Sequence, residues 1–258
     1  MKKLFKNQIK LIRSLDTKKG RKESGLFIVE SKKAVLELVG TDIKIEYLVF
    51  DNQFDSNTID KIVKLLENPD IFTTDDFNRI SSLKNSEGVI VVAKIPEFKE
   101  IDEFISEKKS LLGLFDINDP GNLGTIIRTS LWYGLDGIIL FGNSVDLYSP
   151  KVIRSSMGGL FKSDIVVVNS YNDIKKEINS FKKVGTFLDE KHDFRNKSTS
   201  KTMSKIMLLL GNEANGLNNS LKTEINCNYR INNKTDFESL NVSIAAGIIM
   251  DRIFGDNS

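Results

Sequence analysis

Cysteine and histidine are almost absent from this chain, which has one residue of each among 258. The single cysteine, Cys227, excludes an internal disulfide and is typical of a reducing compartment. Cys227 and His192 together cannot supply the roughly four ligands of a Cys/His zinc centre, so we expect no metal site. His192 lies in the charged segment 190–193, which predicts a solvent-exposed loop.

Long apolar runs are also missing. No stretch approaches the roughly 18 uninterrupted apolar residues of a membrane-spanning helix. The N-terminus is basic, but it lacks the apolar core of a signal peptide. We therefore expect a soluble, cytoplasmic protein that has no membrane partner.

An excess of one charge is missing from the chain as a whole, because the formal net charge is only +2. The distribution is nevertheless uneven, since residues 1–23 contain nine lysines and arginines against Asp16 and Glu23. A solvated basic helix is the usual explanation of such a cluster. The alternative is a surface that contacts the phosphates of RNA, for which the candidates are Lys18, Lys19, Arg21 and Lys22.

Short β-rich runs alternate with helical patterns along the whole chain. In the first half, strands are expected at 26–29, 46–50, 70–73 and 88–93, and helices at 32–39, 58–66 and 75–82. In the second half, nearly continuous apolar runs predict a parallel sheet covered on both faces, with strands at 111–115, 137–141, 164–168, 184–188 and 206–210. Pro96 and the charged residues after it indicate a linker near 94–106. The chain is thus α/β, with a small N-terminal α/β domain (1–95) and a C-terminal parallel-sheet α/β domain (107–258).

The segment Asp119–Thr129 carries the strongest local signal. It reads Asp-Pro-Gly-Asn-Leu-Gly-Thr-Ile-Ile-Arg-Thr, follows a predicted strand and opens an amphipathic helix. Its proline and glycines allow backbone N–H groups to approach a ligand closely. Alone it is a weak phosphate or nucleotide signal, because it lacks both the spaced glycines of a dinucleotide site and the Gly-Lys-Ser/Thr ending of a Walker loop.

Two further segments near the C-terminus, Leu208–Leu217 and Phe237–Ile249, change this interpretation. In this order, the three segments resemble the signature motifs of the SpoU (TrmH-type) RNA 2'-O-ribose methyltransferases, a branch of the SPOUT class. Residues 1–95 are similar to that family's substrate-binding domain, through the basic run that leads into Gly25–Glu30. The chain departs from the family where Asn232-Asn233 follow Ile231, because Pro-Met is common there.

The resemblance implies a C-terminal domain with a trefoil knot, in which the segment from about Leu210 to Phe254 is threaded through a loop of the chain. Periodicity alone would favour an ordinary unknotted connection. The resemblance also implies S-adenosylmethionine as the methyl donor, RNA as the acceptor, and an antiparallel homodimer whose interface completes the active site. With its separate N-terminal domain and basic residues, the chain resembles family members that act on ribosomal RNA of the 23S type more than compact tRNA enzymes, so ribosomal RNA is expected while tRNA stays possible.

The functional positions of the family map onto this chain residue by residue. The resemblance implies the catalytic residues Asn122, Arg128, Glu213, Ser239 and Asn241, and the donor-binding residues Leu210, Gly211, Asn212, Ile231, Leu240 and Asn241. Each position also has an ordinary explanation, such as a turn glycine at 211, core residues at 231 and 240, a surface arginine at 128, and helix caps at 122 and 239. Because arginine keeps its proton in proteins, we expect Arg128 to stabilise a developing alkoxide rather than to act as the base.

Two other classes of function remain open at this point. A non-enzymatic RNA-binding or ribosome-assembly factor would keep the same fold, although the intact motif residues argue against it. A nicotinamide-dependent oxidoreductase would need a glycine fingerprint that this chain lacks. The sequence identifies neither the modified nucleotide nor its base.

Overall fold

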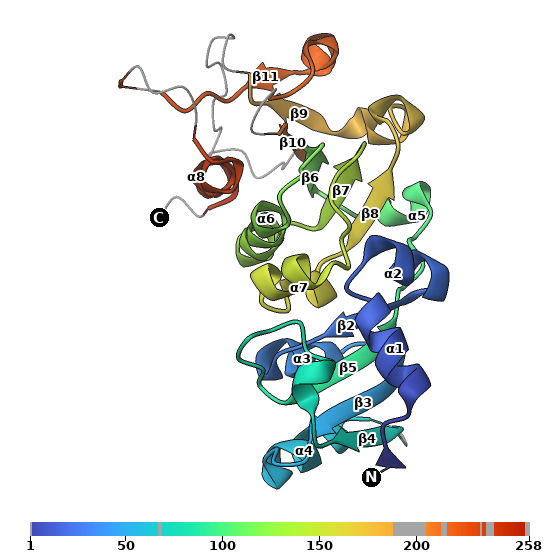
Figure 1. Ribbon diagram of the computed structural model, residues 1–258. Helices are drawn as coiled ribbons and strands as arrows, with labels where there is room; N and C mark the ends of the chain where they lie inside the picture. The colour runs from blue at the N-terminus through green and yellow to red at the C-terminus, as the bar shows by residue number, and fades with distance from the viewer. Residues whose placement is uncertain are drawn as a thin grey trace. The chain divides into compact units, whose positions relative to one another are not determined.

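The computed structural model describes residues 2–66, 69–187, 205–212, 216–232, 234–235 and 240–255. The chain forms two compact units (Figure 1). Unit 1 consists of Met1–Glu97 and Asp146–Lys162, and unit 2 consists of Phe98–Val145 and Ser163–Ser258. The chain therefore returns to unit 1 for one short segment, which no sequence pattern indicated.

Unit 1 is built on a five-stranded sheet in the order β1-β4-β3-β5-β2. Its strands are β1 (Lys2–Lys3), β2 (Leu26–Val29), β3 (Ile45–Asp51), β4 (Ile71–Thr74) and β5 (Val89–Lys94). Strand β5 is antiparallel to β2 and β3, whereas the other pairs are parallel. The strands expected in this half of the chain are confirmed with small shifts at their ends. Strand β1 is too short to show a period in the sequence.

The α-helices of unit 1 are α1 (Lys6–Ser14), α2 (Lys18–Ser24), α3 (Lys32–Val39), α4 (Ser56–Val63) and α7 (Pro150–Ser156), with the 3₁₀ turns η1 (Phe77–Arg79) and η2 (Gly159–Lys162). These α-helices have polar N-cap residues, except for α1, whose N-cap is Phe5. Thr17 and Ser31, for example, each accept a hydrogen bond from a backbone N–H of the first turn. The helix expected at 75–82 is wrong, because only η1 forms there. The buried Glu30 carboxylate accepts hydrogen bonds from the hydroxyl groups of Ser81 and Ser82, which holds this stretch in a non-helical conformation.

The sheet of unit 1 is covered on both faces. Successive strand residues point to opposite sides, so Phe27 and Ile28 belong to different faces. On one face, Ile28 packs in a cluster with Ile12 of α1. On the other, the ring of Phe27 lies 4.9 Å from the ring of Tyr148 and 6.1 Å from that of Phe161, measured between centroids. These aromatic contacts explain why the later segment of the chain folds with unit 1.

Unit 2 is built on a six-stranded sheet in the order β11-β9-β10-β6-β7-β8, and every pair in it is parallel. Its strands are β6 (Ser110–Phe115), β7 (Gly137–Phe141), β8 (Ile165–Val168), β9 (Lys182–Gly185), β10 (Ile206–Leu210) and β11 (Cys227–Asn228). Its helices are α5 (Ile101–Ile105), α6 (Pro120–Trp132) and α8 (Val242–Phe254), with the 3₁₀ turns η3 (Tyr171–Asp173), η4 (Glu177–Ser180) and η5 (Asn219–Glu224). The predicted parallel sheet, and with it the α/β class, is confirmed.

Several expectations for unit 2 need correction or stay open. Part of the predicted linker at 94–106 is folded as α5, because Phe104 is only 1% exposed and packs into the core of unit 2. His192 lies outside the described residues. The trefoil knot stays a prediction, since the chain that would form it includes 188–204 and 213–215, which are also outside them. None of the helices in the described ranges is long and apolar enough to cross a membrane.

Candidate active site

The first two sequence motifs meet at one edge of the sheet in unit 2. Strands β6 and β10 are parallel neighbours, with Leu114 paired to Leu210. The chain leaves β6 toward α6 and leaves β10 at Gly211, so both connections start at the carboxyl edge. In open α/β sheets, ligands bind at this edge. The topology therefore places the motifs where a small-molecule site is expected.

The start of α6 leaves the Asn122 side chain available for a tertiary contact. Asp119 is the N-cap, and its carboxylate accepts a 2.8 Å hydrogen bond from the backbone N–H of Asn122. The side-chain amide of Asn241 donates a 3.1 Å hydrogen bond to the Asn122 side-chain oxygen. Asn122 is therefore not the helix cap, and motifs one and three are joined directly.

Asn241 also caps the last helix. Its side-chain oxygen accepts hydrogen bonds from the backbone N–H of Ser243 at 2.9 Å and from the hydroxyl of Ser243 at 2.6 Å. The alternative explanation of Ser239 as a helix cap is wrong, because α8 begins at Val242 and Asn241 is its N-cap. Ser239 lies outside the described residues. One asparagine thus fixes the start of α8 and its link to α6.

Helices α6 and α8 run side by side in the same direction. Asn122 contacts Asn241 near their starts, and the Tyr133 hydroxyl donates a 3.2 Å hydrogen bond to the Asp251 carboxylate near their ends. Arg128 is exposed between these points. It follows Asn122 by six residues, or about 9 Å along the axis at 1.5 Å per residue. In the described part of the chain, no hydrogen bond joins Arg128 to the Asn122–Asn241 pair.

Gly211 is required by the backbone of its own loop. A Cβ atom at this position would lie 1.9 Å from the carbonyl carbon of Gly216 and 2.3 Å from the nitrogen of Leu217. The Gly216 N–H also donates a 3.0 Å hydrogen bond to the carbonyl of Asn212, which closes the loop. Glu213, in the middle of this loop, lies outside the described residues. A side chain at 211 would therefore collide with this backbone before it could meet a bound donor.

The other expected donor-binding residues differ in their exposure. Leu210 is buried at the end of β10, Ile231 is half-buried, and Leu240 is 48% exposed. Ile231 and Leu240 therefore are not simple core residues. S-adenosylmethionine fits this edge chemically, because its adenine needs apolar walls and backbone partners, and Gly211 presents backbone without a side chain directly after β10.

Two residues that sequence reasoning missed hold this edge together. The Thr186 hydroxyl donates a 3.1 Å hydrogen bond to the carbonyl of Leu209, which ties the end of β9 to β10. The buried Asn228 side chain accepts a 2.8 Å hydrogen bond from the N–H of Phe187 and donates a 2.9 Å bond to its carbonyl. A polar residue at the end of an apolar strand is the signal that could have identified Thr186.

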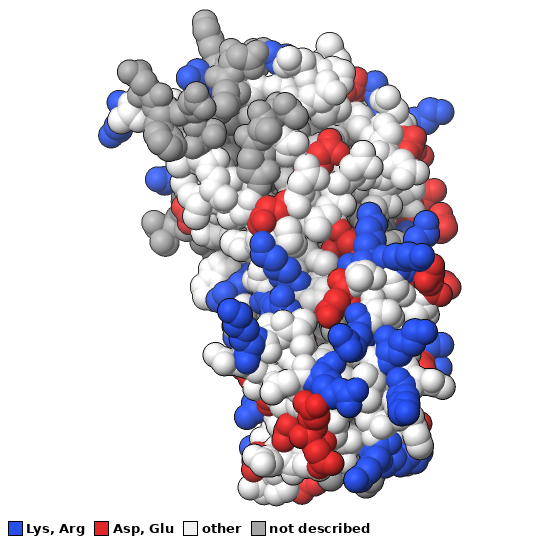
Figure 2. Space-filling model, in the orientation of Figure 1, with Lys and Arg blue, Asp and Glu red and all other residues white. Residues whose placement is uncertain are grey.

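The candidate RNA contacts on α2 divide into two kinds. Lys18, Lys19 and Lys22 are exposed, and Figure 2 shows basic side chains gathered over the part of unit 1 that carries α1 and α2. The prediction that Arg21 contacts RNA phosphates is wrong, because Arg21 is only 3% exposed. Its guanidinium donates to the Asp146 carboxylate at 2.7 and 2.8 Å and to the Leu15 carbonyl at 2.6 Å. Arg21 is therefore engaged within unit 1 and is removed from the RNA candidates.

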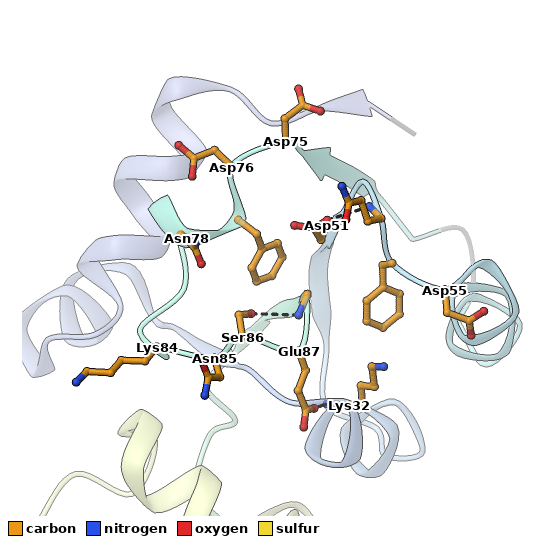
Figure 3. Close-up of a pocket in the computed structure, with 14 residues that line it drawn as sticks. Lys32, Asp51, Asp55, Asp75, Asp76, Asn78, Lys84, Asn85, Ser86 and Glu87 are labelled. Atoms are coloured by element: carbon orange, nitrogen blue, oxygen red, sulfur yellow. Dashed lines mark hydrogen bonds between the residues drawn. The ribbon is translucent and has the colours of Figure 1, made fainter.

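A cavity of about 690 Å³ at the end of β3 in unit 1 is acidic (Figure 3). Five carboxylates and two lysines line it, namely Asp51, Asp55, Asp75, Asp76, Glu87, Lys32 and Lys84. Within the described ranges, no group of His, Cys, Asp and Glu has the geometry to hold a metal ion. Its negative charge would repel RNA.

The sequence matches the models of two known protein families. Residues 109–251 match the model of the SpoU rRNA Methylase family, and residues 6–91 match an MRM3-like substrate binding domain. The class defined by the fold and site is thus that of the methyltransferases. The chain belongs to the SpoU rRNA methylase family, which confirms the resemblance seen in its three motifs.

Individual relatives are similar along almost the whole chain. RlmP of Bacillus subtilis (strain 168), a 23S rRNA (guanosine(2553)-2'-O)-methyltransferase, is 29% identical over 97% of this chain and 97% of its own. A 23S rRNA (uridine(2479)-2'-O)-methyltransferase of Streptomyces viridochromogenes is 29% identical over 92% of this chain and 85% of its own. The crystal structure of an AdoMet-bound rRNA methyltransferase from Sinorhizobium meliloti superposes with a TM-score of 0.84 at 26% identity, over 97% of this chain and 95% of that one.

Proposed function

We propose that this protein transfers the methyl group of S-adenosylmethionine to a ribose 2'-hydroxyl of large-subunit ribosomal RNA. The main support is the hydrogen bond from Asn241 to Asn122, which joins the first and third motifs. The second motif begins in β10, which ends at the same edge of the sheet as β6. Two relatives are named as 23S rRNA 2'-O-methyltransferases, one acting on a guanosine and one on a uridine. Their names support the same class of RNA here and leave the base open.

The reaction makes three demands on the site. Donor and acceptor must be held in line, water must be excluded, and the hydroxyl proton must leave as the new bond forms. When bound, S-adenosylmethionine supplies an activated methyl group on its sulfonium. Leu210, Gly211, Asn212, Ile231 and Leu240 would hold this donor, through backbone groups of the loop after β10 and through apolar side chains.

Arg128 has the electrostatic role in this proposal. Its guanidinium stabilises the alkoxide that develops at the ribose oxygen and contacts the adjacent phosphate, because a fixed cation favours the charge that forms in the transition state. Asn122 and Asn241 position the acceptor side of the site through their mutual hydrogen bond. Glu213 and Ser239, outside the described residues, complete the proposed catalytic set.

A homodimer belongs to the same proposal. Trp132 on α6 is 84% exposed and Ile244 on α8 is 55% exposed, and Leu131, Leu240 and Ile248 are exposed as well. Side chains four residues apart share a helix face, so Arg128 lies on the same side of α6 as Trp132. A partner covering this apolar surface would therefore also meet Arg128.

The dimer is tested by changing Trp132→Asp and measuring the mass in solution by light scattering. We expect a monomer, because an apolar surface of this kind is buried in obligate dimers. Leu65→Asp is the matched control, since Leu65 is 58% exposed in unit 1 and should leave the mass unchanged. A wild-type monomer would remove the dimer from the proposal.

The division of labour and the location are further parts of the proposal. Residues 1–95 would recognise RNA, and residues 107–258, with their trefoil knot, would carry out the transfer. The match of residues 6–91 to a substrate binding domain supports the first part. We place the protein in the cytoplasm, because its single cysteine is typical of a reducing compartment.

The proposed reaction is tested with pure protein, labelled S-adenosylmethionine, and RNA from a strain that lacks the gene. We expect label in large-subunit ribosomal RNA, at a ribose that is unmethylated in the deletion strain and methylated in its parent. Label in tRNA alone would replace the acceptor. Binding of the donor without transfer to any RNA would favour a non-enzymatic RNA-binding factor.

A further inference from the structure

Unit 1 carries a basic cavity besides the acidic one. Its volume is about 320 Å³. It is lined by Lys6, Lys10 and Arg13 of α1, by Arg79 of η1, and by Ile9. Four of the five lining residues are therefore cations, and these differ from the α2 lysines that the sequence had indicated.

The cationic side of α1 is held in place by the opposite side of the helix. Lys6, Lys10 and Arg13 are spaced by four and three residues, so they share one face. Ile12 is fully buried in the core of unit 1, which sets the rotation of the helix. Burial of Ile12 thus keeps the three cations on the surface.

Two carboxylates interact with the cations of this face, since Arg13 acts on the charge of Asp16 and Arg79 pairs with Asp76. Like charges four residues apart, as at Lys6 and Lys10, destabilise a helix. The carboxylate of Asp76 is 3.8 Å from the Nε atom of Arg79, and both side chains are well exposed. Within the described ranges, Lys6, Lys10 and Arg13 are in none of the ion pairs. A bound polyanion would relieve the repulsion along this face.

We propose that this basic cavity binds the phosphates of a single-stranded segment of the substrate RNA. The inference rests on the proposed function and adds an RNA contact on α1 to that on α2. Ile9 offers an apolar surface for a ribose. Phe5, the N-cap of α1, is 65% exposed, and an exposed ring beside cations is the usual stacking partner of an unpaired base. The acidic cavity, which includes Asp76, limits the path of the strand on one side.

The test measures RNA affinity against salt concentration for the full chain. The variant is Lys6→Ala/Lys10→Ala/Arg13→Ala. The matched control removes three exposed lysines, one on α3, one on α4 and one at the C-cap of α4, as Lys33→Ala/Lys61→Ala/Lys64→Ala. The probes are a mixed-sequence RNA of about 15 nucleotides, a length in the range of single-strand binding sites, and protein-free large-subunit RNA. Melting curves establish that both variants fold.

Each phosphate contact to a single strand contributes about 0.7 to the slope of log K against log salt. Loss of three contacts should therefore lower the slope by roughly 2 and weaken binding at least about tenfold near physiological salt. The control should keep the wild-type slope, and S-adenosylmethionine affinity should stay unchanged in both variants. A slope equal to that of the control overturns the inference.

Two outcomes distinguish RNA binding at this cavity from a contact with a ribosomal protein and from a failure of the proposed reaction. If the α1 variant binds protein-free RNA normally but whole ribosomal subunits weakly, the cavity contacts a ribosomal protein and the inference is overturned. If wild-type protein methylates no RNA, yet its RNA affinity falls in the α1 variant alone, the cavity is an RNA site and only the proposed reaction fails.

Discussion

The charge of Arg21 is expected to stabilise the fold of unit 1 and not to bind RNA, and a substitution of Arg21 can test this. Its guanidinium and the Asp146 carboxylate are 4% and 18% exposed, and three N–H···O contacts of 2.6 to 2.8 Å engage the guanidinium. Removal of one partner from a buried ion pair leaves an uncompensated charge, which costs about 3–5 kcal/mol. We therefore expect Arg21→Ala to lower the free energy of unfolding by about this amount.

Urea denaturation followed by circular dichroism measures the effect on unit 1. Lys22→Ala is the control, because Lys22 is the next residue on α2 and is exposed, so its removal should change stability by less than about 0.5 kcal/mol. The double variant Arg21→Met/Asp146→Leu should recover most of the loss, because neither charge is then buried alone.

The salt dependence of RNA affinity tests whether Arg21 also binds RNA. If Arg21 serves only the fold, a folded Arg21→Ala protein at low temperature should keep the wild-type dependence of RNA affinity on salt, whereas Lys22→Ala should reduce it. A stable Arg21→Ala protein with a reduced salt slope would refute the reasoning and return Arg21 to the RNA-binding residues.

Three further predictions concern unit 2. Arg128→Ala should reduce methyl transfer at least about 100-fold with donor affinity kept, as for the loss of an oxyanion donor, and near-normal turnover in single-turnover assays would contradict its role. Gly211→Ala should lower the melting temperature and S-adenosylmethionine affinity together, because its Cβ would lie 1.9 Å from the Gly216 backbone; calorimetry that finds lost affinity at an unchanged melting temperature would point instead to a direct contact. Burial raises the pKa of Asp136, but hydrogen bonds from Lys109 and Ser110 lower it more, so its net pKa is below the ordinary 3.8. Asp136→Asn should therefore reduce the urea midpoint at pH 6, and the difference from wild type should shrink as the pH falls below 3.8, whereas a constant difference would exclude the carboxylate charge as its source.

The local pattern of apolar residues was sufficient to predict most of the helices and strands. The predicted bounds of β2, β7, β10 and α3 agree with those in the structure, because these segments have an apolar period or a continuous apolar run that local geometry can satisfy. The helix expected at 75–82 failed for a non-local reason, since the carboxylate of Glu30, distant in sequence, holds the chain that follows η1.

The order and composition of three motifs determined the family, the methyl donor and the class of reaction, since these depend on which residues are present. Tertiary structure decided their roles. Asn122 accepts a hydrogen bond from Asn241, 119 residues away in the sequence, and Asp119, not Asn122, is the N-cap of α6. Arg21 became a buried ion-pair residue because Asp146, 125 residues away, folds onto it. Sequence period reports the conformation of neighbouring residues, but burial of a charge or an amide depends on which distant segment removes water from it, and only the folded chain determines that.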